Sequence, residues 1–178
     1  MDNYTSLVVL CGDRQQEVFV RRFLERCGVI PKRIRYKTCP RGKGAGEQYV
    51  RDMYPDEVRE HRRNRHLTIG LVVVIDADLG SVSNRLEQLD DALEHVRLCK
   101  READERIGIF VPKRNIETWI HYLQGMPVNE VDTCPRLTGR ESDCKRVVEA
   151  LADSRHNPLP DDAPPSLRIA CDELDRVL

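Results

Sequence analysis

Short apolar runs separated by amphipathic stretches make up most of this chain. Residues 6–11 and 67–76 are apolar on both faces, as in strands buried inside a parallel sheet. Charged and apolar residues alternate over 32–38, which predicts an edge strand with one charged face. Residues 106–111, ended by Pro112, form a fourth predicted strand.

Between these runs, apolar residues recur every three or four positions, which predicts helices. Asp13 suits the start of the first helix and Gly28 its end, while Pro55 is expected to bend or divide the second helix. The repeated alternation of strand and helix predicts an α/β fold. We expect a mostly parallel, four-stranded, Rossmann-like sheet flanked by helices.

The last part of the chain follows a different pattern. After Gly125 the sequence is irregular, and two shorter helices follow with a proline-rich connector between them. We expect an α/β domain over 1–125 and a short helical C-terminal extension over 126–178 that packs on the same domain.

Composition narrows the class of protein. With 178 residues, of which 40% are hydrophobic, the chain is long enough for one real core. The net charge of −1 gives no overall attraction to nucleic acid, so any such binding must come from local patches. No apolar run has membrane-spanning length, no signal peptide is evident, and the seven cysteines contain no CxxC pair, so we expect a cytoplasmic protein without zinc or disulfides.

The candidate chemistry begins with Asp76 and Asp78, which follow the most apolar strand. Alternate residues of a pleated strand point the same way, and ligands of open parallel sheets collect beyond the carboxyl ends of the strands. Paired carboxylates at that edge favour Mg²⁺ or Mn²⁺. The simpler alternative is that one aspartate caps the next helix and the other is solvated in a loop.

Other candidates follow neighbouring strands. Asp13 and Glu17 come after the first strand, although Asp13 also suits a helix cap. Glu117 lies among apolar positions after the fourth strand, where an idle carboxylate is costly, so it is a metal ligand or an orienter of Lys113 or Arg114. These two cations are expected to neutralise phosphate charge in a transition state.

A basic segment is the predicted nucleic-acid contact, because a phosphate backbone is attracted to clustered cations. Its members are Arg33, Arg35, Lys37, Arg41 and Lys43. The glycine-rich loop at 42–46 lacks the residue order of a P-loop or dinucleotide motif, so a connector is the simpler interpretation. A second basic cluster at 59–66 closes a helix, where cations complement the helix dipole.

The order of these motifs resembles TOPRIM domains, the phosphoryl-transfer fold of topoisomerases, primases and OLD-type nucleases. The matching segments are 7–19, with Asp13 after the first strand, 72–78, with its D-x-D, and 112–119, which is similar to the Glu-x-Trp region of small bacterial members linked to defence against mobile elements. The family usually has Glu-Gly after strand one, where this chain has Cys11-Gly12. Either Asp13 or Glu17 replaces that glutamate, or catalysis is impaired.

The resemblance implies a metal site of Asp76, Asp78, Glu117 and Asp13 that holds Mg²⁺ or Mn²⁺, with Glu17 as a further catalytic candidate. The expected function is nuclease-like phosphoryl transfer on DNA or RNA, together with a companion protein or further copies of the chain. The alternative is a catalytically degenerate TOPRIM-like module that binds nucleic acid or a partner protein. A haloacid-dehalogenase phosphatase is disfavoured, because its D-x-D follows the first strand of the fold.

Overall fold

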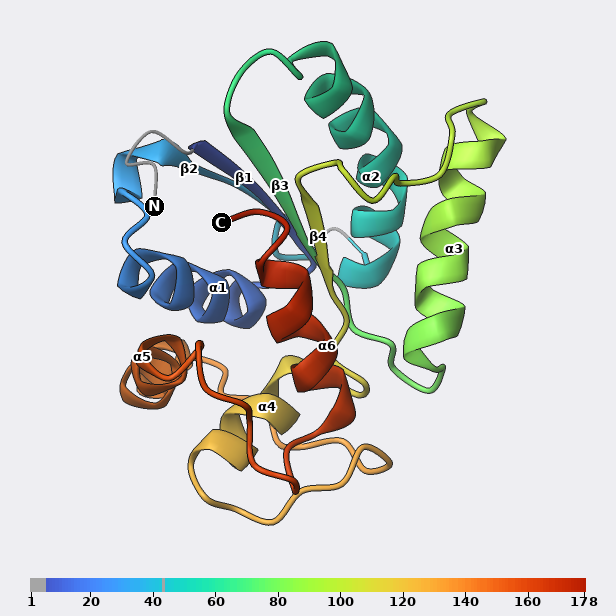
Figure 1. Cartoon of the computed structure of the whole chain (residues 1–178). Helices are drawn as coiled ribbons and strands as arrows, with labels where there is room; N and C mark the ends of the chain where they lie inside the picture. Colours follow the sequence, from blue (N-terminus) through green and yellow to red (C-terminus); the bar gives the residue numbers. More distant parts are fainter. Residues whose placement is uncertain (1–5, 43) are drawn as a thin grey trace.

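A parallel sheet forms the centre of the molecule in the computed structural model, which describes residues 6–42 and 44–178 (Figure 1). Its strands are β1 (Ser6–Cys11), β2 (Ile34–Thr38), β3 (Ile69–Val74) and β4 (Ile107–Phe110). They pair in the order β2-β1-β3-β4, and every pair is parallel. The expected α/β fold with a four-stranded parallel sheet is therefore confirmed.

The helices cover both faces of this sheet. They are α1 (Arg14–Arg26), α2 (Gly46–Arg63), α3 (Val82–His95), α4 (Ile116–Leu123), α5 (Lys145–Asp153) and α6 (Pro165–Leu174), with 3₁₀ turns η1 (Pro31–Arg33) and η2 (Glu141–Cys144). In the described part of the chain, no helix is long and apolar enough to cross a membrane.

The alternation of side chains along the strands divides the core in two. Leu7 and Val9 of β1 face a cluster formed with α1, α4, α5 and α6. Val8 and Leu10 face the opposite cluster, formed with α2 and α3. Figure 1 shows the resulting three layers, with the sheet between the two groups of helices. A strand buried on both faces must be apolar throughout, as the sequence of β3 is.

Local signals set most of the element boundaries. Asp13 caps α1, its side chain accepting a hydrogen bond from the Gln16 amide, and Gly28 follows the helix with φ 93°. The edge strand begins at Ile34 and not at residue 32, because η1 occupies Pro31–Arg33. Helix α2 runs through Pro55 without a break, so the expected division of this helix does not occur.

The C-terminal extension packs against the rest of the chain. Helix α5 lies against α1, and α6 lies against β4. Gly108 permits the close approach of α6, because a Cβ atom there would lie 2.8 Å from the Glu173 carbonyl oxygen. The Glu173 carboxylate accepts a hydrogen bond from the Ile109 amide of the edge strand and pairs with Arg101. The division into an α/β domain over 1–125 and an extension of the same domain over 126–178 stays a prediction.

Replacing Glu173 tests how much α6 stabilises the sheet. Glu173→Ala leaves the Ile109 amide and the Arg101 guanidinium without this partner, so we expect unfolding free energy to fall by about 1–3 kcal/mol. Urea denaturation measures the change. The control is Asp172→Ala, an exposed neighbour on the same helix; equal effects of the two substitutions would contradict the assigned role of Glu173.

Candidate functional site

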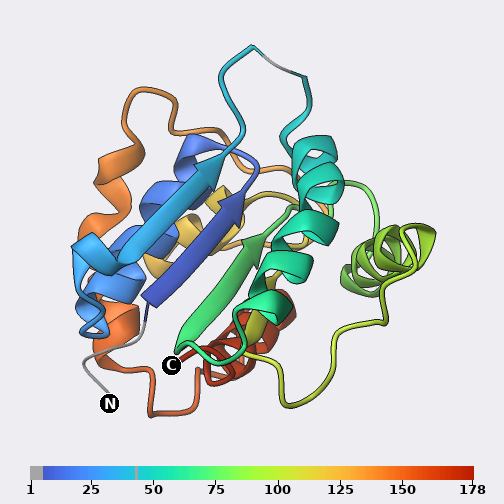
Figure 2. The same cartoon turned by 90° about the horizontal axis from the view of Figure 1, so that it is seen from above.

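The candidate site lies where the strand order reverses. From β1 the chain moves to β2 on one side, and β3 then pairs on the other side of β1. Ligands of open α/β sheets bind in the crevice at such a switch point, beyond the carboxyl ends of the strands. In Figure 2 the strand arrowheads point toward this edge, where the β2–α2 loop and the loop after α4 also lie.

A cavity of about 510 Å³ occupies this edge. Acids from three strand–helix turns line it: Asp13 after β1, Asp76 and Asp78 after β3, and Glu117 after β4. The structure thus brings together the four residues that the sequence predicts as metal ligands. Its walls also carry Arg14, Arg41 and Arg136 and the glycine-rich loop, so acidic and basic groups face one space.

Asp76 is the most electrostatically unfavourable of these acids. Its Oδ1 atom is shielded from solvent and has no hydrogen-bond partner among the described residues. Burial raises the pKa of the Asp76 carboxyl well above its ordinary range, and the negative charges of Asp13, Asp78 and Glu117 raise it further. The side-chain amide of Gln16 lowers the pKa of Asp76. A buried oxygen without a donor or a cation is a costly arrangement.

Glu117 shares this environment in the first turn of α4. Only 3% of its surface is exposed. Burial raises the pKa of Glu117, and the charge of Asp13 adds to that effect, while its own amide, Arg136 and the Leu137 amide oppose it. Asp13 therefore acts on both buried acids while it also caps α1.

Asp78 differs from the other acids because it has a counterion. Its backbone is left-handed, with φ 51°, and its side chain is exposed. Asp78 Oδ2 lies 3.4 Å from Nη2 of Arg85, a buried arginine that also pairs with Glu47 Oε2 at 2.9 Å. Asp78 and Glu47 also line a second, adjoining cavity of about 280 Å³, so Asp78 lies between the two.

The carboxylates do not converge on a single point. Among the described residues, no group of three or more His, Cys, Asp and Glu side chains is placed to hold a metal ion. Asp13 is engaged in its cap and Asp78 with Arg85, and like charges without a cation repel one another. The donor set, four carboxylates with one buried orphan oxygen, nevertheless fits a hard divalent cation.

Lys113 and Arg114 hold the turn that carries the D-x-D. The Lys113 ammonium donates to the Gly80 carbonyl at 2.5 Å, and Arg114 donates to the Asp78 carbonyl at 3.0 Å. Neither residue lines the main cavity. In this structure both residues hold the backbone around Asp78 through its carbonyl groups. The sequence predicts a phosphate contact for them, and the residue type alone does not tell the two kinds of contact apart.

Asp13 and Glu17, the two candidates to replace the glutamate that the TOPRIM resemblance leads us to expect, occupy different places. Asp13 lines the cavity, whereas Glu17 accepts a hydrogen bond from Thr38 Oγ1 at 2.6 Å and pairs with Arg14. Cys11, which stands where the TOPRIM resemblance leads us to expect glutamate, contacts Thr38 Oγ1. Burial raises the pKa of its thiol to about 12, which disfavours the thiolate near neutral pH in the metal-free protein.

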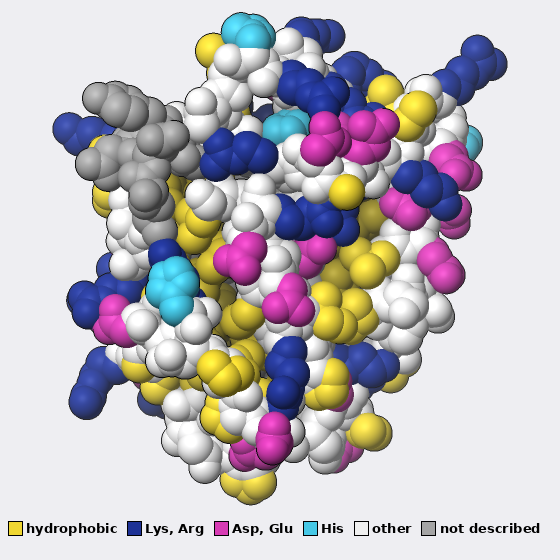
Figure 3. All heavy atoms as spheres, in the orientation of Figure 1, with side chains coloured by type: hydrophobic (Ala, Val, Ile, Leu, Met, Phe, Trp, Pro, Cys, Tyr) yellow, Lys and Arg dark blue, Asp and Glu magenta, His cyan; other side chains and the backbone are white. Residues whose placement is uncertain are grey.

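Of the predicted nucleic-acid contacts that the structure describes, only Arg41 lines the cavity. Arg35 is exposed on β2, Arg33 is half-buried, and Lys37 pairs with the buried Glu57 of α2. Lys43 lies outside the described residues. The second basic cluster is largely paired with acids, as in the contacts of Arg62 with Glu105 and of Arg65 with Asp104. On the face in Figure 3, cations are interspersed with acids and form no continuous basic field.

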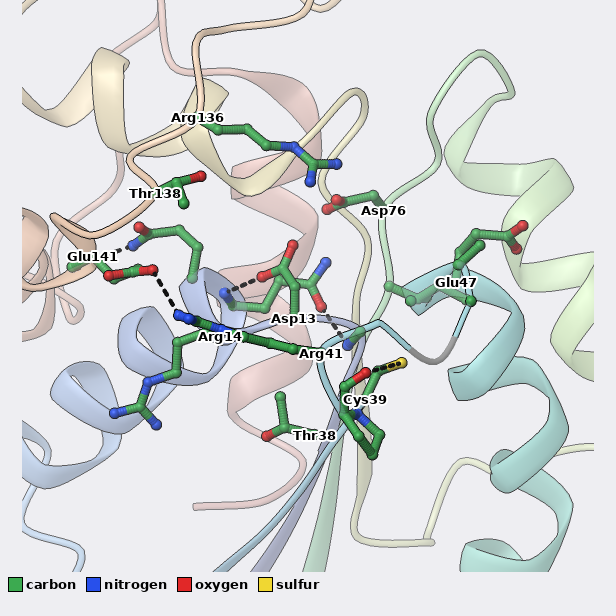
Figure 4. A pocket seen from close by; sticks show the side chains of 18 of the residues that line it. Asp13, Arg14, Thr38, Cys39, Arg41, Glu47, Asp76, Arg136, Thr138 and Glu141 are labelled. Atoms are coloured by element: carbon green, nitrogen blue, oxygen red, sulfur yellow. Dashed lines mark hydrogen bonds and ion pairs between the residues drawn. The ribbon is translucent and has the colours of Figure 1, made fainter.

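Sequence reasoning missed the contribution of two loops. Arg136, Thr138 and Glu141 come from the segment between α4 and α5 and line the cavity opposite the β2–α2 loop (Figure 4). That segment has no regular periodicity, so no sequence signal linked it to the strand ends. For the glycine-rich loop, the glycine at position 46 was the available sequence signal. A Cβ atom there would lie 2.2 Å from the Gly12 carbonyl oxygen, so this close contact requires glycine. This contact places the start of α2 at the cavity.

Comparison of the chain with protein-family models, curated proteins and solved structures gives no match.

The raised pKa of Asp76 predicts a pH-dependent penalty on stability. Because the folded-state pKa exceeds the unfolded value, ionising Asp76 destabilises the metal-free protein as pH rises from about 4 through the folded-state pKa. Asp76→Asn removes this ionisation. We expect it to raise Tm at about pH 7.5, with the gain fading at about pH 3.5, where both states are protonated.

Thermal melts in a chelating buffer measure this difference. Asp91→Asn, at an exposed position of α3 away from the cavity, is the matched control and should show no pH-dependent gain. A lower Tm of Asp76→Asn at about pH 7.5, or a gain that is the same at both pH values, would refute the assignment.

Proposed function

We propose that this protein is a divalent-metal-dependent phosphoryl-transfer protein that acts on nucleic acid in the manner of a nuclease. The observation that carries the proposal is the meeting of Asp13, Asp76, Asp78 and Glu117 in one cavity at the switch point of the sheet. Ordinary structural acids form ion pairs or face water. Here, among the described residues, Asp13, Asp76 and Glu117 form no ion pair, although Glu117 is buried and the Oδ1 atom of Asp76 is shielded from solvent.

The chemistry of these side chains supports a role for Mg²⁺ or Mn²⁺. Asp76 and Glu117, with Asp13 and Asp78 beside them, would hold the cation through carboxylate oxygens. When bound, such an ion activates water and offsets charge on a phosphoryl group. Lys113 and Arg114 keep the Asp76–Gly80 turn in place through its carbonyls, while Arg14, Arg41 and Arg136 supply positive charge on the cavity wall.

A non-catalytic TOPRIM-like module that binds nucleic acid or a partner protein is the second candidate. The observation in its favour is Cys11, a buried thiol where the family resemblance places a glutamate. Such a module would keep the cavity and its cations without supporting turnover. Metal uptake with no cleavage of any nucleic acid would favour this candidate over the nuclease.

The setting of this activity is part of the proposal. All seven cysteines are free, which agrees with a reducing compartment such as the cytoplasm. The near-neutral net charge gives little long-range attraction to nucleic acid, so we propose that a companion protein or further copies of the chain help to deliver the substrate. A role in defence against mobile elements follows only from the family resemblance.

Metal uptake and cleavage test the proposal together. We expect calorimetry to detect Mn²⁺ binding to the wild type, and Asp76→Asn to weaken it because a buried ligand charge is lost. Cleavage of single-stranded DNA and RNA with Mg²⁺ or Mn²⁺ should fall by about 100-fold or more in the same variant. Asp91→Asn should match the wild type in both assays. No Mn²⁺ uptake by the wild type would sink the proposal.

A further inference from the structure

Arg136 is an exposed arginine that lines a cavity rich in acids. It lies in the loop between α4 and α5 and lines the cavity with Asp76 and Glu117. In Figure 4 its guanidinium points toward the side of the cavity where Asp76 lies. It makes no hydrogen bond or ion pair with any described residue, although its charge lowers the pKa of Glu117.

The other arginines of the cavity are engaged. Arg14 pairs with Glu17, and Arg41 lies 3.7 Å from Glu141. On the remainder of the same loop, Arg140 pairs with Asp143 at 2.7 Å and does not line the cavity. Arg136 thus differs from its neighbours in keeping all its donors available beside the acids. A planar guanidinium in this state suits bidentate binding of a phosphate.

The opposite wall offers a second group of donors. Helix α2 begins at Gly46, and its N-cap residue Ala45 makes no side-chain hydrogen bond to the first turn of this 18-residue helix. Gly44, Ala45 and Gly46 all line the cavity. The backbone amides and the dipole at a helix N-terminus favour an anion. The space of about 510 Å³ is of the size that holds a small ligand, such as one nucleotide unit of a strand.

We propose that Arg136 binds a phosphate group of a nucleic-acid strand in this cavity, opposite the amino end of α2, so that the C-terminal extension completes the site. This inference rests on the proposed function for the identity of the strand. Arg136 would then supply positive charge to a cavity in which Asp13, Asp76, Asp78 and Glu117 supply negative charge. A cation held by the acids and a phosphate held by Arg136 would then compensate each other's charge.

The test compares Arg136→Gln with Arg140→Gln, a matched loss of one arginine from the same loop. Both are made in the Asp76→Asn background, in which the proposed function expects cleavage to be about 100-fold slower or more, and the measurements are made in a chelating buffer. Fluorescence anisotropy with a short single-stranded DNA oligonucleotide measures affinity over a range of salt concentrations. We expect Arg136→Gln to weaken binding about tenfold or more and to reduce the salt slope by about 0.7, as for one lost phosphate contact.

A conservative variant separates contact from structure. Arg136→Lys keeps the charge and should retain the salt slope with an intermediate affinity, because only the fork geometry is lost. Arg140→Gln should leave both quantities near those of the background protein. Equal affinity and slope in the Arg136→Gln and Arg140→Gln proteins would overturn the inference.

Metal binding distinguishes failure of this inference from failure of the proposed function. Arg136→Gln, made in the wild-type chain, should bind Mn²⁺ as tightly as the wild type or more tightly, because a positive charge near the acids has been removed. Mn²⁺ uptake and cleavage by the wild type, with unchanged oligonucleotide affinity in Arg136→Gln, overturn only the role of Arg136. No Mn²⁺ uptake, with weaker oligonucleotide binding in Arg136→Gln, overturns only the proposed function.

Discussion

The shielding of the Asp76 carboxylate beside other acids is the physical constraint on which the interpretation of this site depends. Within the part of the chain that the structure describes, its Oδ1 has no hydrogen-bond partner, and burial together with three neighbouring carboxylates raises its pKa. A protein gains no stability from such an arrangement, because buried charge of one sign is penalised by both desolvation and repulsion. Strain of this electrostatic kind is typical of functional sites, where a ligand supplies the missing charge.

The fold concentrates these acids because of its topology. In a parallel sheet every strand delivers its carboxyl end to the same edge, so turns far apart in the sequence meet there. The turn after β3 is then fixed from outside the cavity by Lys113 and Arg114, which bind its carbonyls. Lys113 and Arg114 thus bind backbone carbonyls and form no ion pair with Asp76 among the described residues. A purely structural ion-pair network would neutralise the Asp76 carboxylate.

The fold could be predicted because its signals are local. The apolar runs of β1 and β3, the alternation in β2 and the cap at Asp13 each follow from residues adjacent in sequence, and the strand ends then indicate Asp76, Asp78 and Glu117 as neighbours. The roles of Lys113 and Arg114 were less accessible, since a cation beside an acid gives no sign of whether it will bind a carbonyl or a phosphate. Arg136 could not be found, because an irregular loop has no periodicity that fixes its position.

The central claim is that the acid group is a binding site for a divalent cation, and a crystal structure of the protein soaked with Mn²⁺ tests it most directly. The account predicts an anomalous peak in the cavity with Asp76 Oδ1 in its coordination shell, at about 2.1–2.3 Å, joined by Glu117 or Asp13. A cavity without such a peak in a fully soaked crystal, or Mn²⁺ bound only elsewhere on the molecule, would contradict it.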